Sequence, residues 1–173
     1  ILTGDNKGVV QVWDVHTGCH LYQFPSIHGK TLVAKYAIDE EGSLLFSCAV
    51  DGSCKIRHAF NGEYIATLQP SDDETAGHTT FGEPTACIFG YLHSKRFFIV
   101  SSSLGNLAFW EMPIGNKFTK ETQNIKRKFT TRSNSSMITA MTHQIRREQQ
   151  EETHLSYNLA TVDLSGTLYL WNA

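Results

Sequence analysis

The chain has 173 residues, of which 40% are hydrophobic and 18% charged, and its formal net charge is −2. This length is sufficient for one sizeable hydrophobic core. The near-neutral charge argues against nucleic-acid or membrane-surface binding along the whole chain, because both need a field of one sign. No apolar run reaches the roughly 18 residues that cross a bilayer, so we expect no membrane insertion.

The first predicted elements lie in the segment "ILTGDNKGVVQVWD", residues 1–14. A short apolar run comes first, Gly8 follows, and the residues after it alternate between apolar and other side chains as far as Trp13. Alternation with a period of two predicts a strand with one buried face. The glycine supplies the positive φ of a tight hairpin turn, so a strand, a turn and a second strand are expected.

The same arrangement recurs three times, as "GSCKIR" from Gly52, "GNLAFW" from Gly105 and "GTLYLW" from Gly166. The second and fourth residues after each glycine are apolar, and the fifth is a tryptophan in three of the four copies. The residues at this fifth position are Trp13, Arg57, Trp110 and Trp171. Every tryptophan of the chain therefore occupies the same position in a repeated unit.

Further strand-like segments surround these hairpins. They are "TGCHLYQF" (17–24), "TLVAKYAI" (31–38), "NGEYIATL" (61–68), "PTACIFGYL" (84–92) and "SMITAMTHQI" (136–145). No segment shows a convincing helical periodicity. We therefore predict an all-β chain whose unit is four strands joined by short turns.

The fifth positions are 44, 53 and 61 residues apart along the chain. The first spacing matches the roughly 40–45 residues of a WD40 unit, and the later ones require insertions in surface loops. Loops tolerate such insertions because closure entropy grows slowly with length. We place the insertions at 70–84, 116–136 and 145–154.

With these features the chain resembles the WD40-repeat family over essentially its whole length. The segment "VWD" (12–14), which ends at Asp14, matches the closing dipeptide of the family. The segments "FWE" (109–111) and "LWN" (170–172) are close variants of it, whereas "IRH" (56–58) departs from it. The "GH" doublet of the family is represented only by "IHG" (27–29).

The resemblance implies a partial β-propeller, with about four four-stranded blades of a larger propeller. The blade units are expected at approximately 1–26, 27–70, 84–135 and 136–173, the middle two complete and the outer two partial. The remainder of the same polypeptide would then be needed to close the propeller. The family also implies hydrogen-bonded sets inside the blades, here Thr3 and Trp13 with Asp5, then His28, Ser47 and Asp51, and finally Thr161, Asp163 and Trp171.

We interpret the three tryptophans as packing residues, because an indole buries a large apolar area and its N–H can donate to a Ser or Thr hydroxyl. The sequence predicts no catalytic residues, no cofactor and no metal site. The four cysteines are irregularly spaced, the eight histidines do not cluster as zinc ligands, and the acidic segment "SDDE" (71–74) lacks calcium-loop spacing. Reduced cysteines in an intracellular protein are expected.

The insertion after Trp110 is the strongest candidate for partner binding. Its basic residues are Lys117, Lys120, Lys126, Arg127, Lys128 and Arg132. Two interpretations remain open: an arm that binds an acidic protein surface or nucleic acid, and an outer strand, "IKRKFT", with a solvated face.

These observations favour a non-catalytic protein–protein interaction scaffold in a multi-subunit assembly. The alternative is a nucleic-acid- or chromatin-associated propeller that uses the basic residues of 117–132. Divergent repeats with long insertions are similar to those of multi-propeller proteins in cytoskeletal, ciliary and trafficking assemblies, which implies a cytoplasmic location with cytoskeletal or ciliary association.

Overall fold

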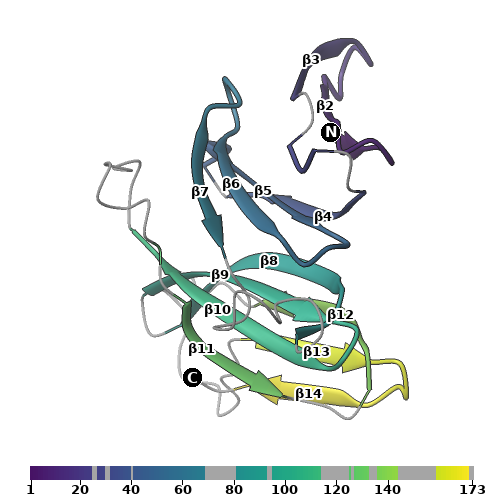
Figure 1. Cartoon of the computed structure of the whole chain (residues 1–173), viewed down its shortest axis with the longest axis vertical. Helices are drawn as coiled ribbons and strands as arrows, with labels where there is room; N and C mark the ends of the chain where they lie inside the picture. Colours follow the sequence, from purple (N-terminus) through teal and green to yellow (C-terminus); the bar gives the residue numbers. More distant parts are fainter. Residues whose placement is uncertain are drawn as a thin grey trace.

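The computed structural model describes residues 1–24, 27–29, 32–39, 41–68, 81–92, 95–113, 125, 127–132, 136–143 and 159–171. In these ranges the chain forms four antiparallel sheets that follow one another in sequence order (Figure 1). The predicted all-β class is confirmed.

Each sheet is built from consecutive strands, and its neighbouring strands are neighbours in sequence. The first sheet contains β1 (Leu2–Gly4), β2 (Val10–Trp13) and β3 (His20–Phe24). The second contains β4 (Val33–Ile38), β5 (Leu44–Ala49), β6 (Cys54–His58) and β7 (Tyr64–Leu68). The third contains β8 (Pro84–Leu92), β9 (Lys95–Ser102), β10 (Asn106–Met112) and β11 (Arg127–Arg132). The fourth contains β12 (Ile138–His143), β13 (Leu159–Asp163) and β14 (Leu168–Trp171).

The repeated glycines lie in the hairpin turns that the alternating pattern predicted. Gly8, Gly52, Gly105 and Gly166 have φ values of 76°, 80°, 78° and 82°. Side chains with a Cβ rarely adopt this left-handed conformation, so glycine is the residue best suited to these turns. Each glycine thereby directs its chain into the next strand of the same sheet.

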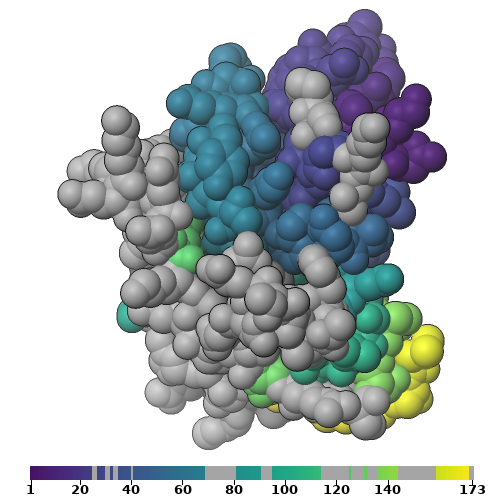
Figure 2. Space-filling model, viewed as in Figure 1, coloured from purple at the N-terminus to yellow at the C-terminus, as the bar shows by residue number. Residues whose placement is uncertain are grey.

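The sheets pack face to face in series. Strand β8 contacts β4 of the second sheet and β12 of the fourth, so the first strands of the second, third and fourth sheets lie side by side. Figure 2 shows the first two sheets in purple and blue on one side of the molecule, with the third and fourth in green and yellow on the other. This order positions the second and third sheets between their sequence neighbours.

Three hydrophobic clusters fill the spaces between consecutive sheets. Strand β9 is buried on both faces. Phe98 and Val100 point to the cluster shared with the second sheet, while Phe97 and Ile99 point to the cluster shared with the fourth. Strands buried on both faces need apolar residues at successive positions.

The repeat fixes which face each position occupies. Leu107 and Phe109, the second and fourth residues after Gly105, pack toward the fourth sheet, and Trp110 packs toward the second. We call the face directed at the following sheet the forward face and the other the backward face. The apolar pair of each repeat thus belongs to the forward face, and the fifth position belongs to the backward face.

The predicted insertions at 70–84, 116–136 and 145–154 lie largely outside the described residues. No helix in the described part of the chain is long and apolar enough to cross a membrane.

Candidate functional site

The repeat positions form hydrogen-bonded turns. Asp5 Oδ1 accepts hydrogen bonds from the backbone N–H groups of Lys7 and Val9 at 2.8 and 2.9 Å. Asp163 Oδ1 accepts from the N–H groups of Ser165 and Thr167, each at 3.0 Å. These acids satisfy backbone donors that a tight turn leaves unpaired, as Asp side chains commonly do.

The turns of the second and third copies are also held by a side-chain oxygen that accepts hydrogen bonds. Asp51 Oδ1 accepts from Ser53 N at 3.0 Å and from Ser53 Oγ at 2.7 Å. In the third copy a hydroxyl replaces the carboxylate, and Ser102 Oγ accepts from Asn106 N at 3.1 Å.

Asp14 has a comparable place in the turn before β3. Its Oδ1 accepts from His16 N at 2.7 Å and Thr17 N at 2.9 Å. The backbone hydrogen bonds from Thr17 and His16 hold the pKa of the Asp14 carboxyl below its usual value. The position therefore stabilises a turn.

Two tryptophans donate to the hydroxyls that the family resemblance implied. Trp13 Nε1 donates to Thr3 Oγ1 at 2.8 Å, and Trp171 Nε1 donates to Thr161 Oγ1 at 3.0 Å. Each hydrogen bond joins the two strands of one hairpin and so holds the indole against its own sheet. Trp171 also packs on the apolar cluster between the third and fourth sheets.

Trp110 lacks this hydrogen bond although its side chain is fully buried. Trp110 pairs with Phe98 as Trp171 pairs with Leu159, so Val100 occupies the position that corresponds to Thr161. A valine side chain cannot accept a hydrogen bond, and Trp110 Nε1 has no partner among the described residues. The sequence signal for this difference was the Ile-Val pair in "FFIVSSS".

A buried polar chain occupies the second copy. His28 Nε2 lies 2.8 Å from Ser47 Oγ, and His28 Nδ1 lies 2.8 Å from Ser53 Oγ, which in turn contacts Asp51. Burial, together with the nearby Lys55 charge, lowers the pKa of His28 to about 4. The imidazole is therefore neutral near pH 7 and serves as a hydrogen-bonding bridge between the loop at 27–29 and the second sheet.

Arg57 stands where the other copies have tryptophan. Its Nη1 donates to the carbonyl oxygen of Gly62 at 2.7 Å, and its guanidinium carbon lies 5.9 Å from the ring centre of Tyr64. Arg57 Nε is buried and has no partner among the described residues. The arginine thus secures the β6–β7 turn in place of an indole.

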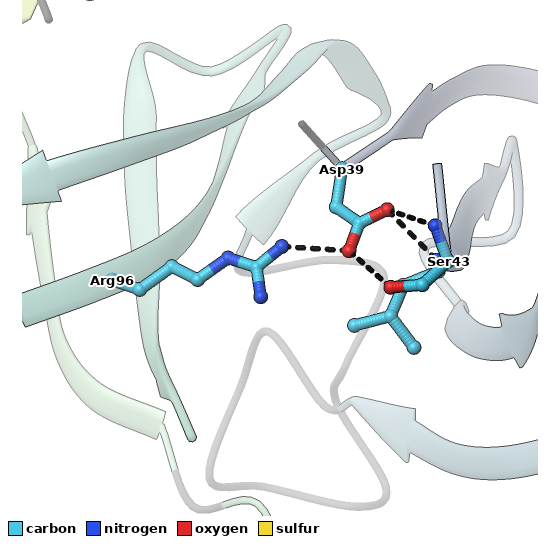
Figure 3. Close-up of polar contacts among 4 residues, drawn as sticks. Asp39, Ser43 and Arg96 are labelled. Atoms are coloured by element: carbon cyan, nitrogen blue, oxygen red, sulfur yellow. Dashed lines mark hydrogen bonds and ion pairs between the residues drawn. The ribbon is translucent and has the colours of Figure 1, made fainter. Parts of the chain in front are cut away.

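The sequence interpretation missed one buried ion pair, which joins two sheets. Arg96 Nη2 donates to Asp39 Oδ2 at 2.8 Å, and Figure 3 shows Ser43 on the other side of the same carboxylate. Ser43 N and Oγ each donate to this carboxylate at 2.6 Å. No short motif contains these residues, because Asp39 and Arg96 are 57 positions apart in the chain.

The basic residues proposed for partner binding are only partly within the described region. Lys117, Lys120 and Lys126 lie outside it, as does the acidic segment 71–74. Arg127, Lys128 and Arg132 lie in β11, one of the two edge strands of the third sheet. The interpretation of "IKRKFT" as an outer strand is therefore confirmed for its backbone from Arg127 onward.

Within the described ranges, no group of three His, Cys, Asp or Glu side chains is placed to hold a metal ion. The cysteines are free thiols, and Cys48 and Cys54 are buried opposite each other on β5 and β6 with their sulfur atoms 2.8 Å apart. Burial raises the pKa of the Cys48 thiol well above its usual value. The arrangement is therefore a set of hydrogen-bonded turns and inter-sheet contacts.

No protein-family model matches the chain. Two solved structures are similar to it: the computationally designed Ika4 protein, with a TM-score of 0.62 and 19% identity, and the computationally designed Ika8 protein, with a TM-score of 0.62 and 18% identity. Each likeness covers 99% of this chain, but 83% of the Ika4 chain and 42% of the Ika8 chain. At these identities the likeness shows the fold alone: an all-β protein of serially packed antiparallel sheets.

Proposed function

We propose that the chain is a non-catalytic protein–protein interaction scaffold, a segment of a WD-repeat β-propeller. The observation that carries this proposal is that the same hairpin, with a glycine turn followed by alternating apolar residues, recurs in four sheets that pack in series. The indole–hydroxyl hydrogen bonds of Trp13 and Trp171 and the face-to-face clusters support it. Loops and edge strands on a packed scaffold are common binding surfaces.

The proposed binding surface is the edge strand β11 and the chain that leads into it. Arg127, Lys128 and Arg132 lie on this edge, and their strand pairs with β10, which carries the buried Trp110. Charged residues on an edge strand disfavour strand addition by other chains, so recognition here would be electrostatic. The partner expected from this chemistry is an acidic protein surface, and a cytoskeletal or ciliary assembly in the cytoplasm is the proposed setting.

The second candidate is a nucleic-acid- or chromatin-associated propeller that uses the same cations. It is favoured only by the density of basic residues in 117–132. The two candidates differ in ionic-strength dependence, because each phosphate contact releases condensed counterions and gives a steep salt slope.

The test is proximity crosslinking with mass spectrometry on the chain in a cell extract, followed by binding of the purified partner. The charge-reversal variant R127E/K128E/R132E should lose the crosslinks at β11 while the chain remains folded. A matched variant, K7E/K35E, changes exposed lysines on the first and second sheets and should retain them. Equal crosslinking by the two variants would refute β11 as the surface, and tight binding of double-stranded DNA with a steep salt slope would favour the second candidate.

A further inference from the structure

The second sheet holds two thiols that lie directly opposite each other. Cys48 on β5 pairs with Cys54 on β6 in the strand register, and both side chains are fully buried. In the adjacent pair, Ala49 N donates to the carbonyl oxygen of Ser53 at 2.9 Å. Hydrogen-bonded and non-hydrogen-bonded pairs alternate along antiparallel strands, so Cys48 and Cys54 form a non-hydrogen-bonded pair.

This position suits a disulfide bond. The Cα atoms of a non-hydrogen-bonded pair are about 4.5 Å apart, and a disulfide joins Cα atoms that are about 4.4–6.8 Å apart. The sulfur atoms of Cys48 and Cys54 are already in contact, at 2.8 Å. A bond between them therefore needs no change of strand register.

The other copies of the repeat have no pair of thiols at this position. The residues that correspond to Cys48 and Cys54 are Gly4 and Val10, Ser101 and Leu107, and Val162 and Leu168. Residues without sulfur thus fill the same place in three hairpins of the same kind. The packing of the repeat does not by itself require a thiol on either strand.

A third thiol lies close to this pair on the next sheet. Cys87 on β8 packs against the cluster between the second and third sheets, which contains Cys48 and Cys54. Burial, together with the nearby thiols of Cys54 and Cys87, raises the pKa of Cys48 well above its usual value. Cys87 is only half-buried. Because oxidation requires thiolate character and access, Cys87 is the one of the three that an oxidant in solution reaches first.

We propose that Cys48, Cys54 and Cys87 form a redox site at which hydrogen peroxide is reduced and Cys48 and Cys54 are oxidised to a disulfide. The Cys87 sulfur first attacks the O–O bond of the peroxide, which gives a Cys87 sulfenic acid and water. The Cys48 thiol then attacks the Cys87 sulfur, the S–O bond breaks, and the hydroxyl leaves with the Cys48 proton as a second water.

The last step transfers the disulfide to the buried pair. The Cys54 thiol attacks the Cys48 sulfur, the bond between Cys48 and Cys87 breaks, and Cys87 leaves as a thiol with the Cys54 proton. In sum, two thiols and one peroxide give one disulfide and two waters. The product joins the strands on either side of the turn at Asp51. This inference depends on the positions of the three thiols and not on the proposed scaffold function.

The experiment is oxidation of the folded, fully reduced chain with increasing hydrogen peroxide, followed by peptide mapping. The remaining thiols are blocked with N-ethylmaleimide in denaturant, and the chain is cleaved next to Asp51. Since Asp51 lies between the two cysteines, a Cys48–Cys54 disulfide joins two separate peptides in the mass spectrum. The linked peptides should accumulate with one peroxide consumed per disulfide and separate on addition of dithiothreitol.

Three variants test the route, and circular dichroism verifies that each retains its β-structure. C87S should slow formation of the Cys48–Cys54 disulfide at least about tenfold, because the accessible thiol is missing. C54S blocks the last step and should accumulate a Cys48–Cys87 disulfide between the second and third sheets. The matched control C19S removes an exposed thiol outside this site and should react like the unmodified chain.

The inference is wrong if Cys48 and Cys54 remain thiols in the folded chain while Cys19 or Cys87 is oxidised. Disulfide formation only at urea concentrations that unfold the chain would also overturn it, because the pair would then not be a site of the folded protein. An unchanged rate in C87S would refute the route through Cys87. The peptide map of the unmodified chain decides the central point even where a variant fails to fold. No partner protein is used, so these outcomes are independent of binding at β11.

Discussion

Arg96 Nη2 donates a hydrogen bond to Asp39 Oδ2 at 2.8 Å across the boundary between the third and second sheets. Both side chains are buried, with 4% and 0% of their surfaces exposed. The guanidinium also lies 5.0 Å from the ring centre of Phe89. Burial by itself raises the pKa of the Asp39 carboxyl, but hydrogen bonds from Ser43, Leu44 and Arg96 outweigh it and hold the pKa below its usual value.

The first prediction concerns this ion pair. The substitution R96M should lower the free energy of unfolding by about 3–5 kcal/mol, because it leaves the Asp39 carboxylate buried without its counter-charge. Urea denaturation followed by circular dichroism measures the change. The pair Lys95–Glu111 provides the control, because its lysine is exposed and its glutamate half-buried (59% and 29%), and K95M should cost about 0–1 kcal/mol. Similar losses of unfolding free energy in the two variants would show that the buried ion pair contributes no more to stability than the Lys95–Glu111 pair.

The second prediction concerns the unpaired indole of Trp110. The substitution V100T should lower the free energy of unfolding by less than about 1 kcal/mol. The new hydroxyl can accept a hydrogen bond from Trp110 Nε1, and this bond offsets much of the free-energy cost of burying the hydroxyl. The same change at Val10, which is also fully buried, introduces a hydroxyl on the opposite face from Trp13 and should cost about 1–3 kcal/mol. Thermal or urea unfolding compares the two variants. If V100T is as damaging as V10T, the repeat register does not determine the partner of the indole.

The third prediction is a pH dependence from His28. Its pKa is about 4 in the folded chain and its ordinary value is 6.5, so between these values the unfolded chain binds a proton that the folded chain does not. Stability should therefore be unaffected by His28 above pH 6.5 and fall as the pH decreases toward 4, by at most about 3 kcal/mol since partial solvent contact screens the effect. Urea midpoints at several pH values measure the slope. The variant H28Q should have a shallower slope, whereas H16Q, at an exposed position, should retain the original one.

The fourth prediction compares two glycines in equivalent turns. Gly18 and Gly62 precede the last strand of the first and second sheets, with φ values of 69° and 72°. A Cβ at Gly18 would meet nothing within 4 Å, so G18A should cost only the left-handed strain of about 1–2 kcal/mol. A Cβ at Gly62 would lie 2.5 Å from Cδ1 of Phe24 in the first sheet.

G62A should therefore cost about 1–3 kcal/mol more than G18A, because the buried Phe24 ring must shift. Urea denaturation of the two variants gives the comparison. In an F24A background, where the clashing ring is absent, adding G62A should cost only about as much as G18A costs in the unmodified chain. If G62A is as stable as G18A, the Phe24 ring at the contact between the first and second sheets shifts without a free-energy cost, and the prediction is wrong.

The sequence of this protein determined the local parts of the fold. Gly8, Gly52, Gly105 and Gly166 identified the hairpin turns because positive φ is a property of a single residue, and two-residue alternation identified the strands because side chains change face at every step. The basic segment beginning at Arg127 could be recognised as a strand for the same reason. The pairing of Trp13 with Thr3 and of Trp171 with Thr161 was implied by the family resemblance, and in the structure the two partners of each pair lie on neighbouring strands.

Only the tertiary structure decided which faces meet and what lies between them. Asp39 and Arg96 carry no local signal, because their interaction depends on the packing of two sheets whose strands are far apart in sequence. The missing acceptor at Val100 became evident from the strand register, which pairs Trp110 with Phe98 and so gives Val100 the position that Thr161 has in the fourth sheet. The exposure of Leu168 and Leu170, 61% and 53%, was likewise not evident from the alternating pattern. Alternation specifies that one side of a strand is apolar, but burial depends on whether another sheet covers that side.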